Sequence, residues 1–248
     1  MTTRSAVLAL ALLGVVWGAS AVGAELTADE LRARIEAAGG RPDLVDLDLT
    51  ELDLAGFDFQ GADLRGTVLK RANLEGANLA ATNLDLVILR EAKLGGADLR
   101  RASVFSAVLA DADLRQADLR EAQLVANFER ADLEGANLAG ANLAADMTNQ
   151  SMGLMRARLR KANLKSANLE GAALSRCSAE FADFSGANLR GADLSRCELA
   201  GADFSGADLT GANLTLADLQ GARFIGITGR DAIIGLDQAV NVKSAHFD

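Results

Sequence analysis

A large apolar residue, most often leucine, occupies every fifth position over much of this chain, for example throughout residues 61–84. The spacing does not drift between Leu49 and Leu124. On an α-helix five residues advance the chain by about 500°, so these side chains would be spread around the helix. On a flat strand, positions five apart point to opposite faces. The five-residue period therefore excludes both a long helix and a flat sheet.

A chain that turns a corner once in every five residues satisfies this period. The central leucine and the residue two places before it then both point inward on every side. That second inward position is mostly alanine, which suits a narrow core that two large residues per side would overfill. Glycine and short polar residues fit the corners.

Quintets such as those at residues 62–66, 136–140 and 207–211 resemble the pentapeptide-repeat family. This resemblance implies an all-β solenoid: a right-handed quadrilateral β-helix with four quintets, about 20 residues, per coil. It extends over residues 44–225, and it implies about nine coils in a rod on the order of 40 Å long.

Both ends of such a rod need caps. Residues 25–43 form the predicted N-terminal cap, because Thr27 and Glu30 make a capping box before a helix from Ala28 to about Ala38. Residues 226–248 depart from the repeat and form the predicted C-terminal cap. We expect a short helix near residues 231–239 there.

The period slips twice. Leu124 and Phe128 are four residues apart, and Leu143 and Leu154 are eleven apart. The second slip predicts a loop at residues 144–153 that carries Met147 and Met152. It is either a site of specificity or a tolerated insertion.

Residues 1–24 have the layout of a secretory signal peptide: a basic start, a short apolar core and small residues before a cleavage point at Ala21 or Ala24. An uncleaved anchor is the alternative. Cleavage predicts a protein exported to the periplasm or the extracellular space, without stable membrane insertion. It removes Arg4 and no acidic residue, so the formal net charge of −9 becomes −10. This charge disfavours direct binding to nucleic acid.

Val68, Ile88 and Val108 recur at intervals of four quintets, at the outward position before the central residue, where Asp or Asn is usual. They should stack as an apolar ladder with Leu86 and Phe105 near its edge. The ladder is either a contact surface, for a homodimer or a protein partner, or a consequence of β-propensity on an exposed strand.

Cys177 and Cys197 are separated by the same interval of four quintets, both at the small inward position. In successive coils their Cα atoms would lie about 4.8 Å apart, within the range for a disulfide. The alternatives are a disulfide between coils and two buried thiols.

Catalytic, cofactor and metal sites are not expected. The only histidine is His246, and the recurring Asp residues lie on every side of the predicted rod instead of converging. We therefore predict a non-enzymatic rigid scaffold for protein–protein interaction. The family resemblance offers one alternative, a DNA-mimicking protein that binds gyrase, which the signal peptide disfavours.

Overall fold

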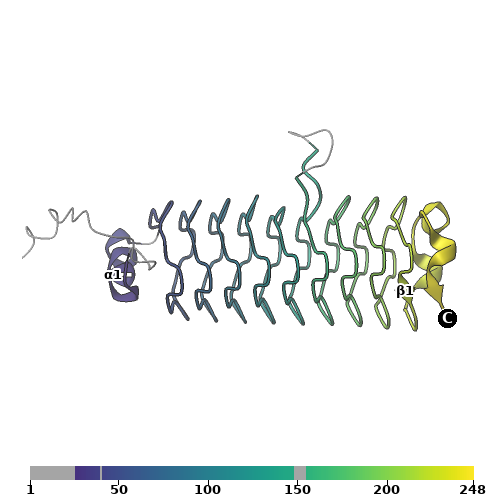
Figure 1. The fold of residues 1–248 in the computed structure, drawn as a ribbon, viewed down its shortest axis with the longest axis horizontal. Coiled ribbons are helices and arrows are strands. Elements are labelled where there is room, and N and C mark those ends of the chain that lie inside the picture. The colour runs from purple at the N-terminus through teal and green to yellow at the C-terminus, as the bar shows by residue number, and fades with distance from the viewer. Residues whose placement is uncertain (1–25, 40, 148–154) are drawn as a thin grey trace, which may run out of the picture.

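The protein is an elongated rod in the computed structural model, which describes residues 26–39, 41–147 and 155–248 (Figure 1). The helix α1 lies at one end of the rod and the C-terminal segment at the other. The predicted signal peptide and its cleavage points lie outside the described residues.

The helix α1 (Ala28–Ala38) begins with a complete capping box. The hydroxyl oxygen of Thr27 accepts a hydrogen bond from the backbone N–H of Glu30 at 3.3 Å, and Oε2 of Glu30 accepts one from the N–H of Thr27 at 2.9 Å. Leu31 is fully buried in the core of the rod. Arg34 donates to the carbonyl of Asp43 at 2.8 Å, which ties the helix to the first coil.

Four ladders of parallel backbone pairs run along the rod. Each residue that precedes a central leucine pairs with its counterpart one coil further on, as in the series Asp58, Asn78, Asp98 and Asp118. Successive quintets contribute to different ladders. The chain therefore forms a four-sided solenoid with one continuous core.

The conformation of each quintet explains the five-residue period. Leu69 and Ala72 both point inward and are fully buried, and the N–H of Ala72 donates to the carbonyl of Leu69 at 3.1 Å. Between them Arg71 has a φ of 55°, the left-handed conformation that turns the corner. Glycine takes this position in many other coils because it adopts such a φ without strain.

Both register breaks fall at the same corner of the rod. In one coil the corner after Leu124 lacks a residue, and the N–H of Ala126 donates to the carbonyl of Leu124, only two residues back, at 2.9 Å. In the next coil the insertion leaves the rod at this corner. The N–H of Asp146 donates to the carbonyl of Met155 at 2.9 Å and closes its base. Residues 148–154, including Met152 and Leu154, lie outside the described residues.

The C-terminal segment differs from the expected short helix near residues 231–239, and that prediction was wrong. Three 3-10 helices are present instead: η1 (Arg230–Ala232), η2 (Leu236–Gln238) and η3 (Val242–Ser244). Each follows a residue with positive φ, at positions 229, 235 and 241, so the last coil turns every six residues. It ends where β2 (His246–Phe247) pairs in parallel with β1 (Arg223–Phe224).

Among the described residues, no helix has the length and apolar character needed to cross a bilayer.

Candidate interaction surface

The apolar ladder predicted from the sequence is stacked in the structure. Val68 pairs with Ile88, and Ile88 pairs with Val108, in consecutive parallel bridges. Ile88 is exposed, and the two valines are half-buried. The three side chains therefore form a line on one face of the rod, at the position of the quintet that carries Asp or Asn in most quintets of the repeat.

Leu86 and Phe105 extend this line around the adjacent corner. The N–H of Leu86 donates to the carbonyl of Phe105 at 2.8 Å, which places the two residues in neighbouring coils. We call the five residues of this surface the apolar corner: Val68, Leu86, Ile88, Phe105 and Val108.

Leu86 is in an unfavourable position for the stability of the fold. Its φ is 62°, a left-handed conformation that costs an L-residue about 1–2 kcal/mol and a glycine very little. Its side chain is 61% exposed, so burial recovers little of this cost. An exposed leucine in this conformation therefore contributes little to the stability of the fold.

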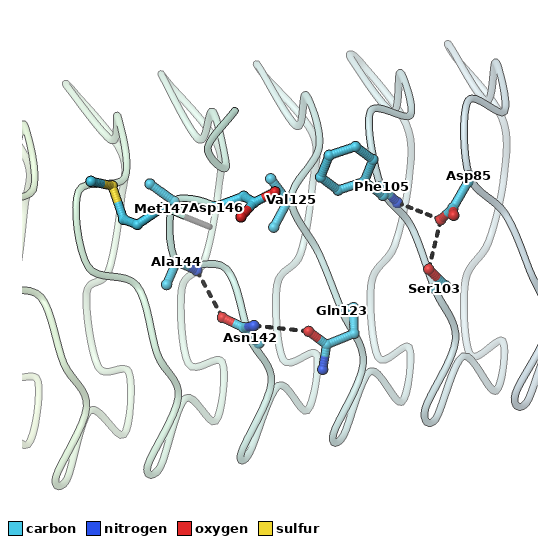
Figure 2. Close-up of a pocket in the computed structure, with 10 residues that line it drawn as sticks. Asp85, Ser103, Phe105, Gln123, Val125, Asn142, Ala144, Asp146 and Met147 are labelled. Atoms are coloured by element: carbon cyan, nitrogen blue, oxygen red, sulfur yellow. Dashed lines mark hydrogen bonds between the residues drawn. The ribbon is translucent and has the colours of Figure 1, made fainter. Parts of the chain in front are cut away.

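Asp85 fixes the backbone of Phe105 from the preceding coil. Its Oδ1 accepts hydrogen bonds from the hydroxyl of Ser103 at 2.6 Å and from the N–H of Phe105 at 2.9 Å (Figure 2). In many other quintets the Asp or Asn two residues earlier accepts from that N–H, as Asp63 does from Arg65. The hydroxyl of Ser103 instead donates to Asp85, and the carboxylate of Asp85 accepts from the N–H of Phe105.

A hollow of about 670 Å³ lies beside the apolar corner. Phe105, Val125 and Met147 follow one edge of it and Gln123 and Asn142 the other (Figure 2). The side-chain amide of Asn142 donates to Oε1 of Gln123 at 2.8 Å. Met147 is 42% exposed here, whereas Met152, also predicted for this surface, lies outside the described residues.

A smaller hollow of about 270 Å³ lies on the other side of the shortened corner, and Val125 lines both. Arg156 and Arg158 belong to its wall. Arg156 donates to both carboxylate oxygens of Glu198, at 2.7 and 2.9 Å, and Arg158 donates to Glu129 at 2.5 Å. These ion pairs hold the second arm of the insertion against the rod.

Neither hollow was predicted from the sequence. Two features of the sequence mark their position: the four-residue spacing before Phe128 and the serine at position 103, where Asp or Asn is usual.

The two cysteines lie inside the rod, away from this surface. Both are free thiols and fully buried, with their Sγ atoms 2.7 Å apart. Cys197 also donates to the carbonyl of Leu174 at 2.8 Å. Burial raises the pKa of the Cys197 thiol well above its ordinary value. The pair is therefore in contact, and the disulfide considered from the sequence remains a prediction.

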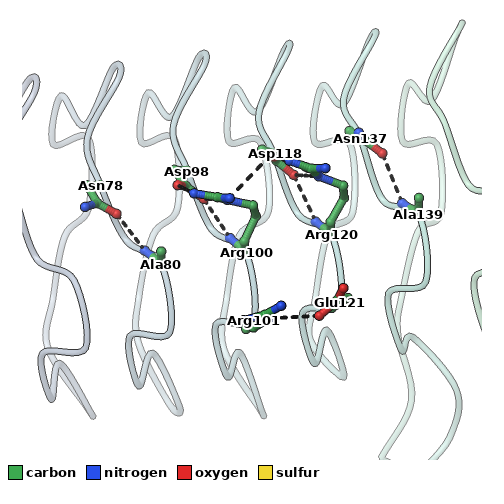
Figure 3. Close-up of polar contacts among 10 residues, drawn as sticks. All are labelled: Asn78, Ala80, Asp98, Arg100, Arg101, Asp118, Arg120, Glu121, Asn137 and Ala139. Carbon is green, nitrogen blue, oxygen red and sulfur yellow. Dashed lines mark hydrogen bonds and ion pairs between the residues drawn. The ribbon is translucent and has the colours of Figure 1, made fainter.

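Elsewhere on the surface, several arginines form ion pairs with nearby carboxylates. Arg100 binds Asp98 and lies 3.8 Å from Asp118, which binds Arg120 (Figure 3). Hydrogen bonds from these arginines lower the pKa of both carboxyl groups below the ordinary value of 3.8. Among the described residues, no group of three or more His, Cys, Asp or Glu side chains has an arrangement that could hold a metal ion.

The chain forms a four-sided β-solenoid with one continuous core, and its two register breaks lie at the same corner. This architecture defines a repeat protein of the β-helix class. The chain belongs to the pentapeptide-repeat family. The family profile described as pentapeptide repeats matches in eight copies, over residues 43–79, 67–104, 126–145, 154–191 and 187–226. Members of this family form right-handed β-helices, and they generally act as structural or binding proteins.

Solved structures of other family members are similar to this chain. HetL, a pentapeptide repeat protein involved in heterocyst differentiation regulation in the cyanobacterium Nostoc sp. strain PCC 7120, is 31% identical, with a TM-score of 0.44; the alignment covers 89% of this chain and 94% of HetL. QnrB1, a plasmid-mediated fluoroquinolone resistance protein, is 20% identical over 81% of this chain and 91% of its own, with a TM-score of 0.35. Comparison with curated protein sequences gives no significant match.

Proposed function

We propose that this protein is a non-enzymatic, exported rod that binds another protein through the apolar corner. The observation that carries this proposal is Leu86, a largely exposed leucine in a left-handed conformation that a glycine would adopt with less strain. Its neighbours Ile88 and Phe105 extend the apolar surface beyond a single side chain.

The rod suits binding because its surface is already ordered. A partner that docks on a rigid backbone causes little further loss of conformational entropy in the rod. Exposed apolar side chains in contact with one another can then be buried at the interface, with a gain of about 25 cal/mol per Å² of apolar area.

Ion pairs on the polar faces argue against the alternative of DNA mimicry. A mimic of duplex DNA needs regularly spaced negative charge, whereas Arg65, Arg100 and Arg120 each bind an aspartate of their own quintet. The apolar corner has no counterpart in the phosphate backbone of DNA. Export of the chain, which rests on residues 1–24, would also separate it from cytoplasmic gyrase.

A pair of matched glycine substitutions tests the proposed surface. Leu86→Gly removes the exposed side chain, while Leu216→Gly makes the same change at another exposed left-handed leucine, outside the apolar corner. The purified protein and both variants serve as bait in affinity capture from an envelope extract, and sedimentation velocity measures self-association.

We expect Leu86→Gly to abolish one specific captured band or the dimer, and Leu216→Gly to keep it. The surface is excluded if neither species depends on Leu86. It is also excluded if both leucines matter equally, because the contact would then not be specific to the apolar corner.

A further inference from the structure

The larger hollow contains a row of four residues along the rod, one from each of successive coils: Asp85, Phe105, Val125 and Ala144. Each follows the central residue of its quintet on the same side of the rod. Because successive coils lie about 4.8 Å apart, Asp85 and Val125 are separated by about 10 Å along the rod axis.

The missing corner residue shapes the middle of this row. Where other coils project a residue of positive φ, the chain passes directly from Val125 to Ala126. The base of the insertion rises beside this depression, at Asp146 and Met147. The result is a groove whose floor is apolar at Phe105 and Val125 and polar at Gln123 and Asn142, with one raised wall.

Among the described residues that line the hollow, the charged side chains are the acidic Asp85 and Asp146. Two hydrogen bonds to Oδ1 fix the orientation of the Asp85 carboxylate, and Oδ2 accepts no hydrogen bond from the residues that the structure describes. Arg65, which lies one coil before Asp85 in the same row, directs its guanidinium to Asp63 at 2.7 Å.

We propose that this groove binds an extended peptide segment of a partner protein, with a lysine or arginine at Asp85 and a large apolar side chain over Phe105 and Val125. An extended chain advances about 3.3 Å per residue, so the two side chains are two or three residues apart in the partner. The carboxylate supplies a charge-assisted hydrogen bond, and the floor supplies apolar burial.

The basic residue is assigned to the Asp85 end because Oδ1 of this carboxylate is held by two hydrogen bonds, whereas Oδ2 accepts none from the described residues. The smaller hollow on the far side of Val125 offers Arg156 and Arg158, each already paired with a glutamate. This inference rests on the proposed protein-binding role and specifies the chemistry of the partner.

A displayed library of random heptapeptides, selected on the immobilised purified protein, tests the proposal. We expect the enriched peptides to carry Lys or Arg two or three residues from a large apolar residue. A fluorescent copy of an enriched peptide then reports affinity by anisotropy. Asp85→Asn keeps the acceptor for Ser103 and Phe105 but removes the charge, and should weaken binding by about tenfold or more.

Asp183→Asn is the matched control, because Asp183 accepts from the N–H of Ser185 at 2.8 Å on another side of the rod. It should leave the affinity unchanged. Enrichment of peptides without a basic residue, or an affinity that is the same for Asp85→Asn and the wild-type protein, overturns the proposal.

Leu86→Gly and Asp85→Asn together distinguish the peptide groove from the protein-binding role proposed for the apolar corner. If capture of the natural partner depends on Leu86 while Asp85→Asn changes neither capture nor peptide affinity, the apolar corner stands and the peptide groove fails. If peptides bind through Asp85 and no partner depends on Leu86, the groove stands and the role proposed for the apolar corner fails.

Discussion

The guanidinium of Arg230 lies over the ring of Phe247, with 4.6 Å between Cζ and the ring centroid. Phe247 is the last member of a stack that begins at Phe184 and continues through Phe204 and Phe224, with centroid separations of 5.0, 4.9 and 4.8 Å. Arg32 covers Phe57 at the other end of the rod at the same distance of 4.6 Å. At each end, therefore, a cation covers an aromatic ring packed on the core.

Loss of the cation over Phe247 should weaken the C-terminal end. We expect Arg230→Ala to lower the free energy of unfolding by about 0.5–1 kcal/mol, and Phe247→Ala by about 1–3 kcal/mol because the half-buried ring also packs on Phe224. Chemical denaturation measures both values. Arg160→Ala, at an exposed site, is the control. Equal stability of the Arg230 and Arg160 variants would contradict the role of this contact.

Gly229 permits the six-residue turn of the last coil. A Cβ atom at this position would lie 2.5 Å from Cα of Thr210, closer than real Cβ contacts, and φ is 77°. We expect Gly229→Ala to destabilise the protein by well over 1 kcal/mol in thermal or denaturant unfolding.

Gly221→Ala is the matched control, because φ is 67° there and nothing lies within 4 Å of the added Cβ. It should destabilise the protein by only about 1 kcal/mol, the cost of the left-handed conformation itself. Similar losses in both variants would mean that the approach of Thr210 relaxes without cost.

The repeat and its ends could be predicted to different extents. Stacking of Val68, Ile88 and Val108 follows from the sequence because every regular coil has the same length, so residues separated by one coil length are in contact. The range of α1 follows from the local pairing of Thr27 with Glu30. Both depend on short-range or strictly periodic information.

The last coil and the groove depend on information of another kind. In the part of the chain that the structure describes, six-residue turns occur only in the last coil, too few copies for their period to stand out in the sequence. The contact of Asp85 with Phe105 crosses between coils, at a quintet where Ser103 replaces the usual Asp or Asn and donates its hydroxyl to the same carboxylate. The groove requires a deletion and an insertion to meet at one corner, which only the folded arrangement brings together.

Acid should weaken the Asp–Arg pairs of the polar faces. The pKa values of Asp98, Asp113 and Asp118 lie below the ordinary value of 3.8, because each accepts hydrogen bonds from an arginine of its own quintet. A carboxyl group whose pKa is lower in the folded state stabilises the fold above pH 3.8, and this contribution is lost as the pH falls through the folded pKa.

Unfolding free energies measured from neutral pH down to below pH 3.8 check this. Asp98→Asn should flatten the acid decline, because it removes one of these carboxyl groups. An identical pH profile for the Asp98 variant and the wild-type protein would show that solvent screening removes the effect.

The N-terminus of the recovered protein tests export. If residues 1–24 direct secretion, the protein isolated from the producing cell should begin at Glu25 or Val22 and fractionate with the periplasm or the medium. Terminal sequencing or intact mass identifies the first residue. A chain that retains Met1 and stays in the cytoplasm would contradict export and remove that objection to gyrase binding.

The buried thiols should be unreactive in the folded protein whatever their oxidation state. Cys197 has a raised pKa because it is buried, and the thiolate is the form that reacts with alkylating reagents. We expect iodoacetamide to modify neither cysteine at neutral pH until denaturant unfolds the rod.

Intact mass then distinguishes free thiols from a disulfide: unfolding without reductant exposes two reactive thiols if Cys177 and Cys197 are free, and none if they are bridged. Rapid alkylation of the native protein would contradict their burial.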